Sequence, residues 1–297
     1  MRIFLTGGTG QIGRAVTKLA ISQGHGVTTL ARSEKSAEIQ KSLGASPIMG
    51  SLTDPSGWVD LALEHDAFIH AAATFDTDMG DVDHNLMAAL SEQSRNLPEG
   101  KQIPFIFTGG CWLYPEEPVI PITERHVLDP LPEFAWMLES IEQLHSCPRF
   151  RLTVIHPALV NDNEKGTIVS YANQLREKGK ISLVASKDIH FPFIHADDLA
   201  DLYLKAIAHA GNGLILNATA IKSATAGEVA NLVATHTGLP CKIEIISIEE
   251  IQDEIGNWAS GYARSQRMSS NRARDLLDWQ PRFDTIEAIV EQCLKTD

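Results

Sequence analysis

Three glycines near the amino terminus, Gly7, Gly10 and Gly13, have the spacing of a phosphate-binding turn. They lie in the segment Thr6-Gly7-Gly8-Thr9-Gly10-Gln11-Ile12-Gly13, which follows a short apolar run and precedes a segment with helical apolar spacing. In such a turn the first glycine allows a tight bend, the second lets the backbone approach a phosphate, and the third lets the helix pack closely. The free N–H groups and partial positive charge at the amino end of the helix would then hold a diphosphate. The segment therefore predicts a dinucleotide-binding site.

The end of the second apolar run, at Arg32 and Ser33, bears on which dinucleotide would bind. An acidic residue there would hydrogen-bond the ribose 2′-hydroxyl of NAD and would repel a 2′-phosphate. Arg32 instead supplies a cation and Ser33 a hydroxyl, and both groups suit a phosphate. These residues favour NADP(H) over NAD(H). The alternative is that Arg32 only solvates the end of a strand, and a comparison of the two dissociation constants would decide between them.

Side chains that could move a proton follow the later apolar runs. Thr108 ends one run, Tyr114 lies just past it, and His156 ends the next run. Tyr114 is the leading candidate for a proton donor, because the nicotinamide should sit at the carboxyl end of a central strand. The alternative is a packed aromatic residue beside Trp112. His156 could be an acid or a cofactor contact, or a hydrogen-bonded core histidine, whereas Cys111 is expected to be a small core residue.

The elements that must position these residues alternate along the first two thirds of the chain. Six short apolar runs are expected to be strands, at Ile3–Thr6, Val27–Leu30, Pro47–Met49, Ala67–Ala71, Pro104–Thr108 and Leu152–His156. Segments with helical apolar spacing separate them, at Ile12–Gln23, Glu34–Lys41, Pro55–Glu64, Asp83–Asn96 and Glu133–Ser146. Unbroken apolar strands separated by helices predict a parallel sheet covered on both faces. The fold class is therefore α/β, with a doubly wound Rossmann sheet.

After His156 the alternation loosens, and the sequence predicts a smaller α+β lobe towards the carboxyl terminus, with a ligand-binding cleft beside the sheet. Helices are expected at Thr167–Lys178, Ala196–Ala210, Ala226–Thr237 and Ser269–Leu277, with a strand at Leu214–Asn217. The predicted dinucleotide-binding domain comprises residues 1–156 with 186–218, and the predicted substrate-binding lobe comprises residues 157–185 with 219–297.

Composition narrows the classes of partner. The chain has 297 residues and a formal net charge of −13, which argues against nucleic acid or an anionic membrane as a partner. The four cysteines have neither metal-ligand nor redox spacing, so no metal site is expected. No run approaches the roughly 18 apolar residues that span a bilayer, and the first residues lead straight into a strand. We therefore expect a cytoplasmic protein without a signal peptide.

With these residues in view, the chain resembles the extended short-chain dehydrogenase/reductase family, the group of NAD(P)-dependent epimerases and dehydratases. The likeness covers almost the whole length. Besides the glycine turn it rests on Gly50-Ser-Leu-Thr-Asp54, Phe68-Ile-His-Ala-Ala-Ala73, His156-Pro157, Ile194-His-Ala-Asp-Asp-Leu-Ala200 and Arg272-Ala-Arg-Asp-Leu-Leu-Asp-Trp-Gln-Pro281. The turn and the resemblance together predict these cofactor contacts: Gly7, Thr9, Gly10, Gln11, Ile12, Gly13, Arg32, Ser33, Leu52, Ala71, Ala72, Ala73, Thr108 and His156.

The resemblance also implies chemistry by a tyrosine and a lysine four residues apart, with a serine after the fifth strand. Placing Glu142 on the family's glutamate in that helix puts Phe134 at the tyrosine and Leu138 at the lysine, and neither side chain can move a proton. The serine position falls in Thr108-Gly-Gly-Cys111. The chain thus looks like an atypical branch of the family that binds the cofactor, lacks the catalytic pair, and has generally undefined substrates.

Two functional hypotheses follow from this departure. The first is an NADP(H)-dependent oxidoreductase or epimerase-like enzyme that acts on a carbonyl or sugar-type small molecule through a non-standard group such as Tyr114. Positioning and oxyanion donors still permit hydride transfer, since general acid–base help contributes roughly 10² to 10⁴ in rate. The second is a non-catalytic NADP(H)-binding sensor that signals to a protein partner. The retained Ile194–Ala200 segment favours the enzyme, which is the hypothesis we prefer.

Substrate and oligomeric state have weaker signals. A sugar nucleotide would need converging cations, and Arg176, Lys178, Lys180 and Lys187 are available for this, although a solvated helix end explains them equally well. The two helical segments at residues 83–96 and 133–146 commonly form a dimer bundle in relatives, which makes a homodimer one option. The other option is that their apolar residues pack inward.

Overall fold

The computed structural model describes residues 1–74, 78–209 and 211–295. The chain divides into two compact units, and each is described by itself. The first unit comprises Met1–Gly109, Ala135–Ile155 and Ala200–Leu216, and the second comprises Gly110–Phe134, His156–Leu199 and Asn217–Asp297. The two units are similar in length because the second takes two internal segments as well as the carboxyl-terminal part of the chain.

A seven-stranded sheet is the framework of the first unit. Its spatial order is β11 (Leu214–Ala218), β7 (Phe150–Pro157), β5 (Ile103–Thr108), β4 (Ala67–His70), β1 (Arg2–Thr6), β2 (Gly26–Ala31) and β3 (Ser46–Met49). The neighbouring pairs from β3 across to β7 are parallel. From β1 the chain continues outward to β2 and β3 on one side, and β4, β5 and β7 follow on the other. The topological switch point therefore lies between β1 and β4, and the predicted doubly wound fold is confirmed.

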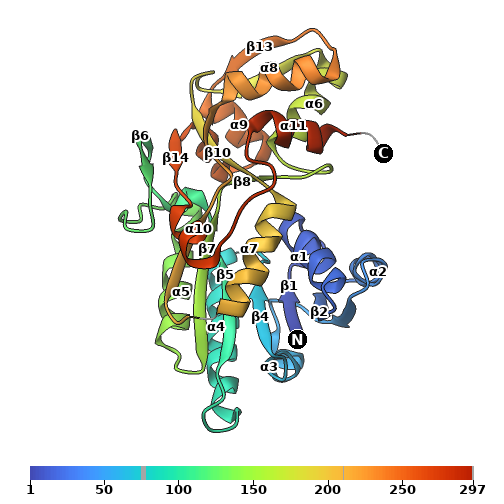
Figure 1. Ribbon diagram of the computed structural model, residues 1–297, viewed down its shortest axis with the longest axis vertical. Coiled ribbons are helices and arrows are strands. Elements are labelled where there is room, and N and C mark those ends of the chain that lie inside the picture. The colour runs from blue at the N-terminus through green and yellow to red at the C-terminus, as the bar shows by residue number, and fades with distance from the viewer. Residues whose placement is uncertain (75–77, 210, 296–297) are drawn as a thin grey trace. The chain divides into compact units, whose positions relative to one another are not determined.

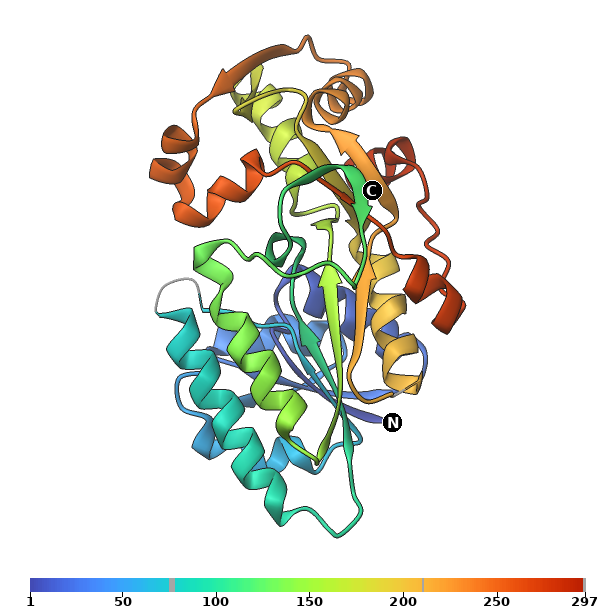
Figure 2. The ribbon, with the colours of Figure 1, turned by 90° about the vertical axis from the view of Figure 1, so that its left-hand side faces the viewer.

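Helices cover both faces of this sheet, as predicted. They are α1 (Gln11–Ser22), α2 (Glu34–Ser42), α3 (Val59–Leu63), α4 (Met79–Gln93), α5 (Trp136–Ser146) and α7 (Ala196–His209). Figure 1 shows α4 and α5 on one side of the sheet and α1 and α7 on the other. Figure 2 shows α4 and α5 lying side by side along the sheet. The last residue of the predicted helix Ala196–Ala210 lies outside the described residues.

A row of phenylalanine rings holds one face of the sheet together. Phe4, Phe68 and Phe105 are paired across β1, β4 and β5, and their ring centroids lie 5.3 and 4.7 Å apart. Phe150 on β7 extends the row, with its centroid 5.1 Å from that of Phe105. All four side chains are fully buried, and truncating one such ring to alanine typically costs about 3–5 kcal/mol. The row therefore fixes the strands whose ends carry the site.

The helices predicted at Glu133–Ser146 and Ser269–Leu277 begin at Trp136 and Asn271, and two further predicted helices differ from the observed ones for local reasons. The helix predicted at Pro55–Glu64 is a 3₁₀ turn, Pro55–Gly57, followed by the short α3. Trp58 separates them: its backbone is not helical, with a φ of −143°, and its buried indole N–H donates to the carbonyl of Ser51 (2.9 Å). The helix predicted to begin at Asp83 begins at Met79, because the carboxylate of Asp78 caps it.

The second unit is built from small sheets and helices. The sheets are β12 (Ile221–Thr225), β10 (His190–His195) and β8 (Leu159–Asn161); β13 (Lys242–Ile246) and β9 (Lys180–Val184); and β14 (Gln266–Met268) and β6 (Glu117–Ile122). The helices are α6 (Thr167–Lys178), α8 (Ala226–Thr237), α9 (Ile248–Ile255), α10 (Asn271–Leu277) and α11 (Ile286–Leu294). The predicted bounds of α6 and α8 are confirmed, whereas the strands of these small sheets were not predicted. In the described part of the chain, no helix combines the length and the apolar composition that a membrane span requires.

Candidate functional site

The glycine turn has the close contacts that its spacing predicts. Gly7 has a φ of +82°, and a Cβ at this position would lie 2.4 Å from the carbonyl oxygen of Ala71, which follows β4. A Cβ on Gly13 would lie 2.1 Å from the carbonyl oxygen of Gly7, so the first turn of α1 presses directly on the turn. Both positions exclude a side chain, for conformational and steric reasons. The backbone is therefore bare where a diphosphate would approach.

The amino end of α1 is open to a ligand. Gly10 is the cap residue of the helix and has no side chain to occupy the first N–H groups, and its own N–H donates to the Gly7 carbonyl (2.9 Å). The first turn contains no acidic residue. Thr9, Gln11 and Ile12 remain partly exposed around it. An anion placed here would meet the backbone N–H groups of the first turn and the positive end of the helix dipole, so the residues present fit a dinucleotide diphosphate.

A buried polar chain that the sequence reasoning missed ties this turn to the sheet. The Thr6 hydroxyl lies 2.8 Å from Nδ1 of His70, and Nε2 of His70 lies 2.8 Å from Oδ1 of Asp83. Thr6 ends β1, His70 ends β4 and Asp83 lies on α4, and all three side chains are buried. Thr6 directly precedes Gly7, and His70 directly precedes Ala71. These hydrogen bonds therefore hold the ends of β1 and β4, at the topological switch point, in a fixed register.

Three of the predicted cofactor contacts, Arg32, Ser33 and Leu52, lie at or near the end of β2. The carbonyl of Ala31 accepts a hydrogen bond from the backbone N–H of Gly50 (3.0 Å), which joins this strand end to the segment that contains Leu52. Leu52 is half-buried against the core cluster of the first unit. Arg32 is exposed and makes no hydrogen bond or ion pair with the residues that the structure describes. The Ser33 hydroxyl caps α2 by accepting from the backbone N–H of Ser36 (3.2 Å).

The remaining predicted contacts of the first unit follow β4 and β5. Ala71 and Ala72 are half-buried after β4, and Ala73 is exposed. Thr108 ends β5, is half-buried, and has its hydroxyl 2.8 Å from the hydroxyl of Tyr203. Burial raises the pKa of Tyr203, so this phenol keeps its proton and can donate it to Thr108 in a hydrogen bond.

In the second unit, Tyr114 is part of the core. It is only 1% exposed and packs with Cys111, Ile122 and Met268. Burial, reinforced by the negative charge of Glu124, raises the pKa of Tyr114 well above its ordinary value. These observations favour the packed-aromatic alternative over the proton donor that the sequence suggested.

The two neighbours of Tyr114 are also buried and neutral near pH 7. The ring of His156 meets that of Tyr114 edge to face, with centroids 5.1 Å apart. Burial lowers the pKa of His156 to about 4, although its interaction with the backbone of Gly110 raises the pKa in part. The Nδ1 atom of His156 is buried without a partner among the described residues. Burial raises the pKa of the Cys111 thiol to about 12, which leaves too little thiolate for a nucleophile.

Four aromatic side chains gather in the second unit, and we call them the aromatic site: Trp112, Phe134, Trp258 and Tyr262. The ring of Trp112 stacks on Phe134 and lies near Trp258, with centroids 5.9 Å apart in both cases, and it meets Tyr262 edge to face at 5.4 Å. Phe134, which the resemblance places at the family's tyrosine, thus contributes a ring face here. Its assignment to that position, and that of Leu138 to the lysine, stay predictions.

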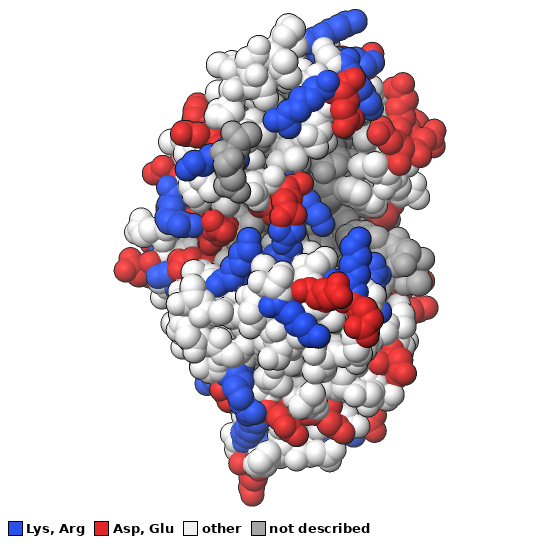
Figure 3. Space-filling view, turned by 90° about the vertical axis from the view of Figure 1, so that its right-hand side faces the viewer, with Lys and Arg blue, Asp and Glu red and all other residues white. Residues whose placement is uncertain are grey.

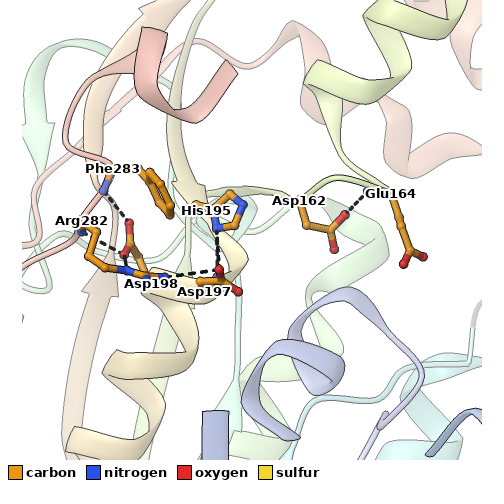
Figure 4. A network of polar contacts seen from close by, with 7 residues as sticks. All are labelled: Asp162, Glu164, His195, Asp197, Asp198, Arg282 and Phe283. Atoms are coloured by element: carbon orange, nitrogen blue, oxygen red, sulfur yellow. Dashed lines mark hydrogen bonds and ion pairs between the residues drawn. The ribbon is translucent and has the colours of Figure 1, made fainter. Parts of the chain in front are cut away.

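The Ile194–Ala200 segment makes hydrogen bonds and ion pairs with the carboxyl-terminal part of the chain. Figure 4 shows Asp198, at the start of α7, accepting the backbone N–H groups of Arg282 (2.9 Å) and Phe283 (3.1 Å) with its two carboxylate oxygens. His195 lies 3.7 Å from the carboxylate of Asp197, and burial lowers its pKa despite that negative charge. These contacts hold the carboxyl-terminal segment at the start of α7. In them the side chains of His195, Asp197 and Asp198 all have partners.

The four basic residues that the sequence offered for a sugar nucleotide all lie in the second unit. Arg176 hydrogen-bonds within its own helix, and Lys180 pairs with Glu244 at 2.6 Å. Lys178 and Lys187 are exposed. On the face drawn in Figure 3, basic and acidic side chains are interspersed rather than gathered into one basic surface. Within the described residues, no three His, Cys, Asp or Glu side chains are grouped as a metal ion would require.

The comparisons with known proteins agree with this geometry. Residues 3–218 match the family model described as the NAD dependent epimerase/dehydratase family. An uncharacterized protein of Schizosaccharomyces pombe, C2A9.02, is 23% identical over 287 residues, which cover 96% of this chain and 97% of that protein. The structure of UDP-glucose 4-epimerase from Thermotoga maritima, with UDP-glucose, has a TM-score of 0.81 at 18% identity and covers 98% of each chain. That of UDP-glucuronic acid 4-epimerase from Bacillus cereus, with UDP-glucuronic acid and NAD, has a TM-score of 0.82 at 14% identity, covering 99% of this chain and 98% of that one.

Proposed function

The chain belongs to the NAD dependent epimerase/dehydratase family, and from this premise we propose that it is an NADP(H)-dependent oxidoreductase acting on the carbonyl group of a small molecule. The observation that carries the proposal is the bare turn at residues 7–13, which presents the amino end of α1 to a diphosphate. The cofactor, when bound, supplies a hydride. Reduction of a carbonyl takes up that hydride at carbon and a proton at oxygen, and it leaves an alcohol and the oxidised cofactor.

The preference for NADP(H) is supported by Arg32. Its exposed guanidinium follows β2 and has no partner among the described residues, so it is available to a 2′-phosphate. Calorimetric titration with NADPH and NADH tests this directly. We expect Arg32→Ala to weaken NADPH binding by about tenfold, roughly 1.4 kcal/mol, while NADH binding stays unchanged. Lys41→Ala removes an exposed cation from the last turn of α2, the helix that follows Arg32, and is the matched control. Tighter binding of NADH than of NADPH by the unmodified protein would end the NADP(H) preference.

Thr108 is the residue that we propose to hold the substrate oxygen. It ends a central strand, is half-buried, and is backed by the protonated hydroxyl of Tyr203. Tyr114 and His156 are each only 1% exposed, so neither side chain is available to a ligand in this conformation. The Thr108 hydroxyl can donate a hydrogen bond to the substrate oxygen while it accepts a hydrogen bond from the Tyr203 hydroxyl. Hydrogen bonding of this kind stabilises the developing oxyanion without a strong acid.

A turnover assay tests the activity. NADPH consumption by the purified protein is followed with aldehydes, ketones and enones. Thr108→Val is expected to lower kcat by about 10²-fold, the loss typical of one oxyanion donor, whereas Thr108→Ser should keep most of the rate. Absence of turnover above background with every substrate, alongside tight NADPH binding, would defeat the oxidoreductase proposal.

A further inference from the structure

The aromatic site is assembled from three segments that are far apart in the sequence. Trp112 comes from the turn Cys111–Leu113, which follows the carboxyl end of β5 by two residues. Phe134 comes from the turn at residues 132–134, and Trp258 and Tyr262 come from the turn at residues 257–263. All four side chains are only half-buried. Ring faces are therefore held together where solvent or a ligand still reaches them.

The packing of Trp112 shows that the site is shaped closely. Its indole lies flat against the backbone of Gly261, where a Cβ would be only 2.4 Å from Cε2 of the ring. A residue with any side chain at position 261 would displace the indole. Trp112 also keeps contact with the buried cluster that contains Tyr114, so packing fixes its orientation, and its ring lies between the Gly261 backbone and Phe134.

The indole N–H groups of the aromatic site differ from those of the buried tryptophans in their hydrogen bonding. Trp58 and Trp279 are buried, and each donates its N–H to a backbone carbonyl, at 2.9 and 3.0 Å. The N–H groups of Trp112 and Trp258 donate to no residue that the structure describes, and neither nitrogen is among the buried atoms that lack a partner. Two donors thus remain accessible at the edge of a set of ring faces.

Arg264, the positively charged residue that follows Tyr262 in the sequence, already has hydrogen-bond partners. One terminal nitrogen of the Arg264 guanidinium, Nη1, donates to the carbonyls of Tyr114 (2.7 Å) and Asp129 (2.6 Å). A nucleoside diphosphate would need bidentate cations of this kind. Stacked rings with free N–H donors suit a different ligand: a flat, uncharged molecule that carries an oxygen acceptor.

We propose that the aromatic site binds a planar aromatic or conjugated ketone by stacking, with an indole N–H donating to its oxygen. This binding uses residues of the second unit alone, so it does not rest on the proposed function. A sugar nucleotide is not the ligand of this site.

The test compares three probes on the full-length protein by calorimetry and tryptophan fluorescence, without cofactor. The probes are 2-acetonaphthone, its saturated analogue 2-acetyldecalin, which has the same carbon skeleton without a flat ring system, and UDP-glucose. We expect 2-acetonaphthone to bind at least tenfold more tightly than either of the others. Equal affinity for the two ketones, or tighter binding of UDP-glucose, would overturn the inference.

Substitutions in the aromatic site test whether 2-acetonaphthone binds there. Trp258→Ala should weaken binding of 2-acetonaphthone about tenfold, and Phe134→Leu, which keeps apolar volume but removes a ring, should weaken it severalfold. Trp258→Phe keeps the stacking face and loses only the N–H, so its effect should be smaller. Val119→Ala, at an exposed position on β6, is the control. Unchanged affinity in Trp258→Ala and Phe134→Leu, with melting temperatures preserved, would refute the site.

The outcomes separate this inference from the proposed function. Binding of 2-acetonaphthone that Trp258→Ala weakens, in a protein that binds neither NADPH nor NADH, would support the aromatic site and overturn the oxidoreductase. Tight NADPH binding and turnover of other carbonyl compounds, with no preference for the flat ketone, would keep the oxidoreductase and overturn the aromatic site.

Discussion

The glycine turn and the aromatic site are built by opposite means. The turn at Gly7–Gly13 excludes side chains, and the donors that it would offer are backbone N–H groups set by one strand and one helix that are adjacent in sequence. The aromatic site consists of side chains, and its rings come from three turns, of which the first and the last are more than a hundred residues apart. A diphosphate needs aligned backbone dipoles, whereas a flat ring needs faces. The comparison teaches that one chain can build one site locally and the other only by folding.

The largest effect should follow from filling the turn. Gly13→Ala places a Cβ 2.1 Å from the Gly7 carbonyl oxygen, which should abolish measurable NADPH binding and lower the free energy of unfolding by about 3 kcal/mol. Binding of 2-acetonaphthone should persist, because the aromatic site belongs to the second unit. Calorimetry with both ligands and urea unfolding make the measurement.

The control for this variant is Gly57→Ala, since a Cβ at position 57 meets nothing within 4 Å. If Gly13→Ala left NADPH binding intact, the claim that a bare backbone carries cofactor recognition would be wrong.

The second unit should lose stability in mild acid. His156 has a folded-state pKa of about 4, below its ordinary 6.5. Between these values the unfolded chain binds a proton that the folded chain does not, so stability falls as the pH decreases through that window. At about 1.4 kcal/mol per pKa unit the loss is on the order of 3 kcal/mol.

Urea unfolding at a series of pH values checks this. His156→Phe should flatten the slope between pH 6.5 and 4 without removing it, because burial also lowers the pKa values of His190 and His195. An identical slope in the variant would show that His156 is not buried in its neutral form.

A smaller effect should follow from cutting the polar chain beneath the turn. Asp83→Ala leaves Nε2 of the buried His70 without its partner, which should cost about 2 kcal/mol of unfolding free energy. NADPH binding should weaken as well, since Thr6 and His70 hold the residues that flank the diphosphate. Asp83→Asn keeps an oxygen acceptor and should recover most of both losses.

Asp81→Ala, at an exposed position on the same helix, is the matched control, measured by thermal unfolding and calorimetry. Equal NADPH affinities for Asp83→Ala and Asp81→Ala would restrict the polar chain to a structural role.

The smallest effect should come from the Tyr114 hydroxyl. Tyr114→Phe removes a buried hydroxyl and keeps the packed ring, which should cost about 1 kcal/mol of stability and leave NADPH turnover nearly unchanged. Tyr171→Phe, which removes the hydroxyl of another buried tyrosine of the second unit, is the control. A large loss of turnover in Tyr114→Phe alone would return Tyr114 to the position of proton donor.

The sequence carried most of the information about the first unit. Three glycines between an apolar run and a helical pattern require a particular backbone path, and that requirement acts over eight neighbouring residues. The alternation of strands and helices likewise predicted the sheet, because periodicity is a local property. The start of α4 was misplaced since the cap at Asp78 lies outside the apolar pattern.

What pattern reasoning could not supply was the partner of each polar or aromatic side chain. His70 and Asp83 are thirteen residues apart, and nothing in their spacing indicates that Thr6 completes the chain. Tyr114 had the right place after a central strand to be an acid, yet the fold buries it.

Taken by itself, the sequence determined where a diphosphate could be held and that a doubly wound sheet would hold it, since both depend on neighbouring residues and their backbone conformations. The tertiary structure alone decided which side chains meet. Trp112 and Trp258 face each other only because distant turns pack together around a glycine. Contacts between segments far apart in the chain depend on the packing of the whole unit, and no local period encodes them.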